Sequence, residues 1–233
     1  MSHLLAGLSL AAEASVLDNI QAFFSEGGPF MYVNVASSAI ALAIIVERAY
    51  RLLFQYSLNA PPFMDQISKL VITNNIDRAV KLCDAAKTAA LARVVRAGLT
   101  RANRGELEVA KAIEESILEV TPLLSKRIAS LWSLANIATL FGLLGTILGL
   151  IHTFSALDKV ADPGRRQQLL AHGISEAMNN TALGLGIAVT CMIGHLLLTN
   201  RAKAMVEEIE ISALKLENML ARRGAGEAGE AQG

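Results

Sequence analysis

Three long runs without a Lys, Arg, Asp or Glu residue constrain the fold more than any other feature of this sequence. They cover residues 30–46, 128–151 and 177–198, so the charged 18% of the chain lies entirely outside them. About 20 consecutive apolar residues are needed for a helix to cross the hydrocarbon core of a bilayer. We therefore predict an all-α integral membrane protein with three transmembrane helices.

The distribution of positive charge predicts how these helices are oriented. Residues 1–29 contain no Lys or Arg, whereas the segments after the first and third runs contain many. Basic segments stay on the cytoplasmic side, which predicts an N-terminus on the outer side of the membrane and a cytoplasmic C-terminus. Residues 1–27 lack the basic start of a signal peptide, and we interpret them as an amphipathic segment on the outer membrane surface.

Helical periodicity continues beyond the second and third runs, which predicts that both transmembrane helices extend into a cytoplasmic helical domain. From Glu106 onward, apolar residues recur every three or four positions up to the second run, and Pro122 predicts a kink in an otherwise continuous helix. The expected segments are transmembrane helix 28–54, cytoplasmic helical domain 55–127, transmembrane helix 128–155, periplasmic loop 156–174, transmembrane helix 175–199, cytoplasmic helix 200–223 and disordered tail 224–233.

Small and hydroxyl residues follow one face of each of the last two membrane helices. They are Thr139, Gly142, Thr146, Gly149 and Thr153 in the second, and Ala177, Thr181, Gly184, Ala188, Cys191 and His195 in the third. Such a face can pack against another helix, for which Gly145 and Gly186 are further candidates, or it can line a hydrated pore. Thr146 and Thr181 are equally far from the loop midpoint near Pro163, so we predict that they lie at one depth.

Polar residues also occur where the third helix enters the membrane. Glu176, Asn179 and Asn180 are costly there unless they face water or a partner. Thr181 is turned about 140° from Glu176, so the preferred arrangement directs Thr181 toward a pore and Glu176 toward a neighbouring helix or the pore mouth. The alternative is a hydrated Glu176 at the membrane boundary. The candidate proton pathway comprises Thr139, Thr146, Thr153, Glu176, Asn180 and Thr181.

Several residues at the helix ends have simpler interpretations. Trp132, near the start of the second run, is typical of the membrane interface, and so are Glu47 and Arg48, which directly follow the first run. His195, near the inner end of the third helix, is interpreted in the same way, with a role in proton relay as the alternative.

The sequence contains no pattern typical of an enzyme. It has no phosphate-binding glycine loop, no metal-ligand cluster and no nucleophile with a base at a diagnostic spacing. We therefore expect no cofactor, no metal and no nucleic-acid partner, and we expect contact with membrane lipid. A passive membrane scaffold that clusters envelope proteins remains an alternative, whereas a small-solute transporter is disfavoured because transporters usually show internal repeats.

Two motifs identify a resemblance to a known family. Residues 141–149 read FGLLGTILG and residues 173–186 read GISEAMNNTALGLG, and together they resemble the paired signature of the MotA, TolQ and ExbB proton-channel family. Three predicted spans resemble the ExbB and TolQ branch. The resemblance implies that Thr146 and Thr181 are pore threonines and that Glu176 is the acidic residue at the start of the third span. Asn179 and Asn180 depart from the small or aliphatic residues usual there.

The resemblance also implies an assembly and a function. Five copies would surround the single transmembrane helices of two ExbD- or TolR-like partners, each of which supplies an aspartate that takes up and releases a proton. The expected function is that of a channel-forming stator subunit of an inner-membrane motor, which uses the proton-motive force to transmit energy to the cell envelope in a TonB/Tol-like or gliding-motility-like system.

Overall fold

The structure is a computed structural model that describes residues 28–230, and the side chains of residues 30–223 within that range. The predicted outer-surface segment 1–27 and residues 231–233 lie outside the described residues. Helices account for nearly all of the described chain, and no strand occurs in it. Three stretches of these residues contain windows long and apolar enough to cross a membrane: Phe30–Ile72, Glu106–Leu157 and Pro163–Arg223. The predicted fold class is confirmed.

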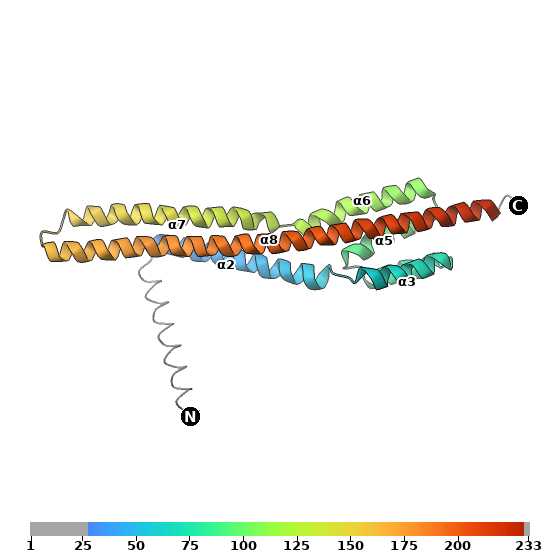
Figure 1. The fold of residues 1–233 in the computed structure, drawn as a ribbon, viewed down its shortest axis with the longest axis horizontal. Coiled ribbons are helices and arrows are strands. Elements are labelled where there is room, and N and C mark those ends of the chain that lie inside the picture. Colours follow the sequence, from blue (N-terminus) through green and yellow to red (C-terminus); the bar gives the residue numbers. More distant parts are fainter. Residues whose placement is uncertain (1–27, 231–233) are drawn as a thin grey trace, which may run out of the picture. The chain divides into compact units, whose positions relative to one another are not determined.

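The described chain divides into two compact units. The first, which we call the membrane unit, comprises residues 28–44 and Ser130–Gly194; the second unit comprises Ile45–Ala129 and residues 195–230. In the membrane unit, helices α7 (Ile128–Leu157) and α8 (Pro163–Glu230) lie alongside each other as an antiparallel hairpin (Figure 1).

Helix α2 (Gly28–Tyr50) continues into a short π-helix, η1 (Arg51–Gln55), and together they cover the predicted first span. In the membrane unit, Met31, Asn34 and Ala41 of α2 are buried. Their spacing of three and seven residues places them on one helix face. That face contains a buried amide, Asn34, in the first apolar run.

Helices α6 (Glu106–Ser125) and α7 are separated by a break at Lys126 and Arg127, which corrects the prediction of one helix kinked at Pro122 (Figure 1). Arg127 has a φ of 62°, a left-handed conformation that is uncommon outside glycine. Two contacts of the second unit hold it there. Arg127 donates to Glu47 at 2.9 Å, and Arg48 donates to the Leu123 carbonyl at 3.3 Å, where α6 leaves carbonyl groups unpaired.

Helix α8 is 68 residues long and begins at Pro163, which corrects the predicted periplasmic loop 156–174. Residues 163–174 are too polar for a hydropathy pattern to include, but they have a strong helix start. The Asp162 carboxylate accepts the backbone N–H of Arg165 at 3.0 Å, and proline is favoured in the first helical turn. The connection to α7 therefore shrinks to residues 158–162. The helix is assigned through Glu230, beyond the predicted end at 223.

The second unit contains three short helices within the predicted helical segment 55–127, together with α6 and the C-terminal part of α8. The three short helices are α3 (Ala60–Ile72), α4 (Ile76–Ala85) and α5 (Ala90–Thr100). Its core consists of large aliphatic side chains, among them Ile67, Val95, Leu99, Val109 and Leu216. This is the packing expected where burial of apolar area stabilises the fold.

Candidate functional site

The α7–α8 hairpin of the membrane unit is held by very close backbone contact. A Cβ atom added at Gly184 would lie 2.6 Å from the Ala138 carbonyl oxygen and 3.0 Å from the Gly142 Cα. One added at Gly149 would lie 3.4 Å from the Ala177 Cβ. The small residues of the two predicted stripes therefore form a packing seam within the chain, as one of the two interpretations of the sequence predicts.

Thr146 and Thr181 meet at the edge of this seam. Their hydroxyl oxygens are 3.1 Å apart, which confirms the predicted common depth. Thr181 Oγ1 is 2.9 Å from the Gly142 carbonyl, to which it donates, and Thr146 Oγ1 is 2.7 Å from the Leu143 carbonyl. Because each hydroxyl carries one hydrogen, Thr146 can donate either to Thr181 or to its own helix. The pair is thus a small hydrogen-bond network with one hydrogen free to change partner.

The surroundings of the threonine pair are apolar. At about 100° per residue, Leu143 of α7 and Met178 and Leu185 of α8 share its side of the hairpin, and all three side chains are exposed within the chain. We call this side the threonine face. Thr139 lies on the threonine face about two helical turns before Thr146 and donates to the Ala135 carbonyl at 3.0 Å. Helix α2 packs on the opposite side, where Asn34 bonds Asn180.

Two of the predicted pore-lining residues are enclosed in the chain. Asn180 is 2% exposed and accepts a hydrogen bond from Asn34 Nδ2 at 3.2 Å. Thr153 is buried, donates to the Gly149 carbonyl at 2.8 Å and fills the space beside Gly173. Their predicted exposure to a lumen is corrected, because α2 and the start of α8 cover them. Glu176 is half-buried, and its place on the helix is turned about 140° from Thr181.

The predicted packing glycines divide into two kinds. Gly145, like Gly142, Gly149 and Gly184, lies in the seam, and a side chain there would occupy the position of the Asn180 amide. Gly186 is exposed, and a Cβ added there would have no neighbour within 4 Å. Gly186 therefore takes no part in the seam of its own chain.

The region of this chain that matches a known protein family includes the α7–α8 hairpin of the membrane unit. Residues 86–211, more than half of the chain, match the MotA/TolQ/ExbB proton channel family. This chain belongs to that family. A protein named ExbB-like 3 from Synechocystis sp. is 30% identical over 167 residues, which are 72% of this chain and 79% of that protein. The Tol-Pal system protein TolQ of Haemophilus influenzae is 31% identical over 108 residues, 45% of each protein.

A solved structure extends the likeness to the fold as a whole. The chain resembles a chain of C. jejuni MotAB with a TM-score of 0.62 and 15% sequence identity, over 94% of this chain and 88% of that one. The region matching the MotA/TolQ/ExbB family contains the part of the hairpin that lies in the membrane unit, with the threonine pair, whereas Asn34 lies outside it. The sequence signal that could have identified Asn34 is a lone amide in the first apolar run, on the buried helix face.

In the second unit of this MotA/TolQ/ExbB chain, two residues assigned to the membrane interface make specific contacts. Arg48 is 1% exposed and bonds the end of α6 rather than reaching for lipid headgroups. His195 Nδ1 lies 3.1 Å from the Ile128 carbonyl oxygen. Because a carbonyl oxygen only accepts, Nδ1 carries the hydrogen in this contact.

The second unit offers no activated nucleophile at its cysteine. Burial, together with a smaller contribution from the neighbouring Asp84 carboxylate, raises the pKa of the Cys83 thiol to about 12. The thiol is therefore protonated at neutral pH and unreactive. Within the described residues, no group of three His, Cys, Asp or Glu side chains could hold a metal ion.

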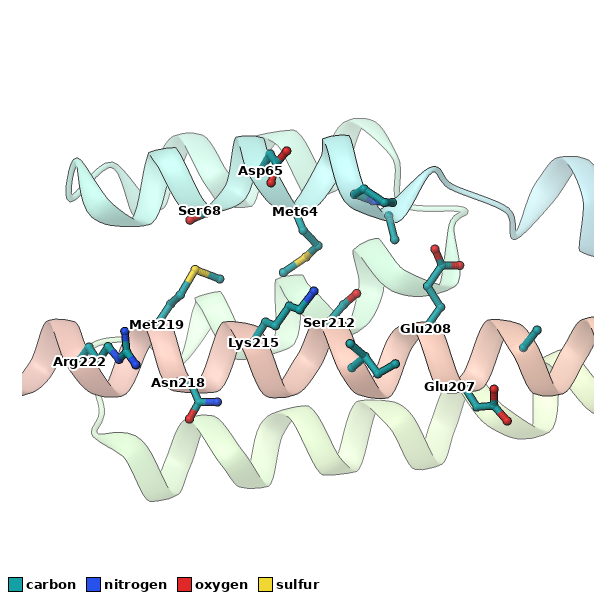
Figure 2. A pocket seen from close by; sticks show the side chains of 14 residues that line it. Met64, Asp65, Ser68, Glu207, Glu208, Ser212, Lys215, Asn218, Met219 and Arg222 are labelled. Atoms are coloured by element: carbon teal, nitrogen blue, oxygen red, sulfur yellow. The ribbon is translucent and has the colours of Figure 1, made fainter.

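A groove of about 640 Å³ lies between α3 and α8 in the second unit (Figure 2). Met64 of α3 and Met219 of α8 point into it, and its α8 wall changes from acidic at Glu208 to basic at Lys215 (Figure 2). Only residues of the second unit line it, so the threonine face contributes nothing to this groove.

Proposed function

We propose that this chain is a channel-forming stator subunit of a proton-driven motor in the bacterial inner membrane, which transmits energy to the cell envelope. The observation that carries the proposal is the Thr146–Thr181 hydroxyl pair, 3.1 Å apart on a face of two candidate spans that is apolar around the pair. Membership of a proton channel family supports it, as do relatives named for ExbB-like transport and for the Tol-Pal system.

The chain needs a proton carrier from elsewhere. The three charge-free runs contain no carboxylate, and Glu176 stands only at the edge of the third. Two ExbD- or TolR-like partners, each with one span and one aspartate, would supply the titrating group, as the family resemblance implies. A neutralised aspartate can pass the apolar threonine face, where the hydroxyl pair donates or accepts at one depth. Each proton crossing 100 mV supplies about 2.3 kcal/mol.

Assembly into a ring, which we take as five copies from the resemblance, is supported by complementary sizes on the two outer sides of the hairpin. The seam contacts pair Gly142 with Gly184 and Gly149 with Ala177. By the same register, Leu140 lies level with Gly186, and Leu144 lies level with Ala182. Copies related by an axis along the membrane normal share one depth, so a head-to-tail contact sets each leucine against a small residue.

The α8 side of this contact is hollowed. A groove of about 400 Å³ between α2 and α8 includes Ala182 and Gly186 in its lining. Leu140 and Leu144 are exposed within the chain. Gly186→Leu would fill the groove and should convert the assembly to smaller species in native mass spectrometry of the detergent-solubilised protein. The size swap Gly186→Leu with Leu140→Ala should restore the ring; an intact ring in Gly186→Leu alone would contradict this contact.

Orientation follows from charge, with a periplasmic N-terminus and a cytoplasmic C-terminus. Labelling of single cysteines introduced near Arg223 and near Asp158, in intact cells with a membrane-impermeant thiol reagent, tests it. Protection near Arg223 with labelling near Asp158 is the expected result, and the reverse pattern would contradict the assignment.

Proton flux tests the function itself. In inverted membrane vesicles that contain this chain and its single-span partner, Thr181→Val should slow dye-monitored proton efflux from the lumen about fivefold, which corresponds to one lost hydrogen bond of about 1 kcal/mol. The matched control is Thr190→Val. Thr190 lies on the opposite side of α8 and donates to the Gly186 carbonyl of its own helix. Because Thr190 also lines the groove between α2 and α8, native mass spectrometry first verifies that the ring of this variant is intact. Equal flux in the wild type and Thr181→Val would favour the passive scaffold.

A further inference from the structure

A pair of amides is buried in the membrane unit on the side of α8 that faces α2. Asn34 of α2 is 0% exposed and donates from Nδ2 to the Asn180 Oδ1 at 3.2 Å. Asn180 itself is 2% exposed. Polar side chains are expensive in such surroundings unless they bond each other. The bond therefore ties α2 to α8 at one defined level.

The hairpin makes room for this pair at the position next to the threonines. A Cβ atom at Gly145 would coincide with the Asn180 Nδ2, so only glycine leaves space for the amide. Gly145 directly precedes Thr146, and Asn180 directly precedes Thr181. Consecutive helical residues point about 100° apart. The amide pair and the hydroxyl pair thus lie on opposite sides of the seam at the same level.

The amide pair is poorly suited to be a purely stabilising contact. Asn34 Oδ1 is buried and has no hydrogen-bond donor, and an unpaired buried acceptor is unfavourable. Two apolar side chains at these positions would avoid the free-energy cost of the unpaired Oδ1. A directional bond, unlike an apolar contact, specifies one rotation and one register of the helices it joins, a role attested for single buried polar residues.

We propose that Asn34 is a positioning residue for the threonine pair. Its bond to Asn180 fixes the rotation of α8 about its own axis, so that Thr181 faces Thr146 and donates to the Gly142 carbonyl. Helix α2, which contributes nothing to the threonine face, thereby sets the geometry of that face. The inference rests on the proposed function only for the purpose that the pair serves, because the geometry can be measured without any proton flux.

Disulfide formation between the two threonine positions measures this rotation. Both native cysteines are replaced in the full-length chain, by Cys83→Ser and Cys191→Ala, and Thr146→Cys and Thr181→Cys are added. Hydroxyl oxygens 3.1 Å apart place the two sulfur atoms close to bonding distance. The rate of oxidation by copper phenanthroline in native membranes is followed by mass spectrometry. Asn34→Leu should slow this rate by about fivefold, as loss of one buried hydrogen bond would.

A second cysteine pair separates rotation from general loosening. A Cβ at Gly149 would lie 3.4 Å from the Ala177 Cβ, near the usual disulfide separation of about 3.8 Å. Asn34→Leu should leave the oxidation rate of Gly149→Cys with Ala177→Cys within about twofold. Ser38→Ala, one turn along α2 from Asn34, should change neither pair. Equal slowing of both pairs by Asn34→Leu would overturn the proposal in favour of a purely structural role.

Two further variants complete the test. In an Asn180→Leu background, Asn34→Leu should have no additional effect on the Thr146→Cys/Thr181→Cys rate, because Asn34 acts through Asn180; additive effects would overturn that step. Asn34→Ala replaces Asn34→Leu if the latter does not reach the membrane, and an unaltered rate in either variant overturns the inference. Failure of the flux experiment with Thr181→Val, by contrast, would leave the cross-linking result intact and reject the proposed function alone.

Discussion

Helix α8 uses two different kinds of packing in the two units through which it runs. In the membrane unit its buried seam residues are small: Ala177, Gly184, Ala188 and Cys191. In the second unit its buried residues are mostly large: Leu198, Met205, Ile209, Leu216 and Leu220. The same helix therefore approaches its neighbour through backbone contact in one unit and through long side chains in the other.

The solvent explains this difference. In water, burying a large aliphatic side chain is favourable because its apolar area leaves water. In a bilayer, lipid tails are as apolar as leucine, so helices associate through close van der Waals contact and small residues are favoured. The comparison teaches that a substitution must be judged by the unit in which it falls, and the following predictions test that lesson from the largest effect to the smallest.

Leu216→Ala should have the largest effect on stability. Leu216 is 0% exposed in the second unit, and truncation of such a side chain costs about 2–5 kcal/mol through lost burial and a residual cavity. Pulse proteolysis of the detergent-solubilised chain in urea measures the change. Leu214→Ala, at an exposed position two residues earlier, is the control and should cost less than about 0.5 kcal/mol. Equal losses would remove the distinction between the two faces of α8 in this unit.

Gly184→Ala should destabilise the hairpin by about 1–3 kcal/mol. The added methyl group meets the Ala138 carbonyl oxygen and the Gly142 Cα, and backbone atoms cannot move aside without separating the helices. The midpoint of thermal unfolding in detergent gives the measurement. An unchanged midpoint would show that the backbone contact is not a packing constraint.

Gly98→Ala is the matched substitution in the second unit and should change stability by less than about 1 kcal/mol. Its Cβ would lie 2.9 Å from both the Cδ1 and the Cγ1 of Ile113 and 3.1 Å from the Leu216 Cδ2, but all three are side-chain atoms, which can shift more easily than the backbone atoms that Gly184 meets. The better helix propensity of alanine, worth about 1 kcal/mol, offsets that adjustment. A loss as large as that of Gly184→Ala in the same assay would break the comparison.

The smallest effect at neutral pH should be that of Cys83, whose contribution to stability changes only in the alkaline range. Its pKa in the fold is about 12, raised from 9.0, so an unfolded chain loses the thiol proton first as pH rises. The contribution of Cys83 to stability is complete below pH 9.0 and is lost progressively toward pH 12. Cys83→Ala should reduce the alkaline decline of the unfolding midpoint. An identical decline in the wild type and in Cys83→Ala would show that other titrating groups cause the loss of stability at alkaline pH.

Local signals explain which features of the fold could be predicted from the sequence. Hydropathy located the three spans, and equal distance from the turn located the Thr146–Thr181 level, because both depend on neighbouring residues in a regular helix. The enclosure of Asn180 could not be predicted, since it depends on Asn34 in a distant part of the chain. The early start of α8 was missed because residues 163–174 form a polar helix that an apolar scan ignores.

The break between α6 and α7 was also beyond local signals. Pro122 predicts an interruption at residue 122, but α6 accommodates this proline and continues to Ser125. Arg127 has a positive φ and forms an ion pair with the Glu47 carboxylate, and Glu47 lies 80 residues earlier. Tertiary contacts of this kind have no periodic signature in the sequence.

The contrast between an uninterrupted α8 and the interrupted α6–α7 path has a mechanical consequence. A continuous ladder of backbone hydrogen bonds resists torsion, whereas a junction of two non-helical residues such as Lys126 and Arg127 can swivel. Of these two paths, α8 is therefore the stiffer along its own axis. A pair of glycine residues inserted into α8 near residue 195 would weaken its hydrogen-bond ladder and make the helix easier to twist.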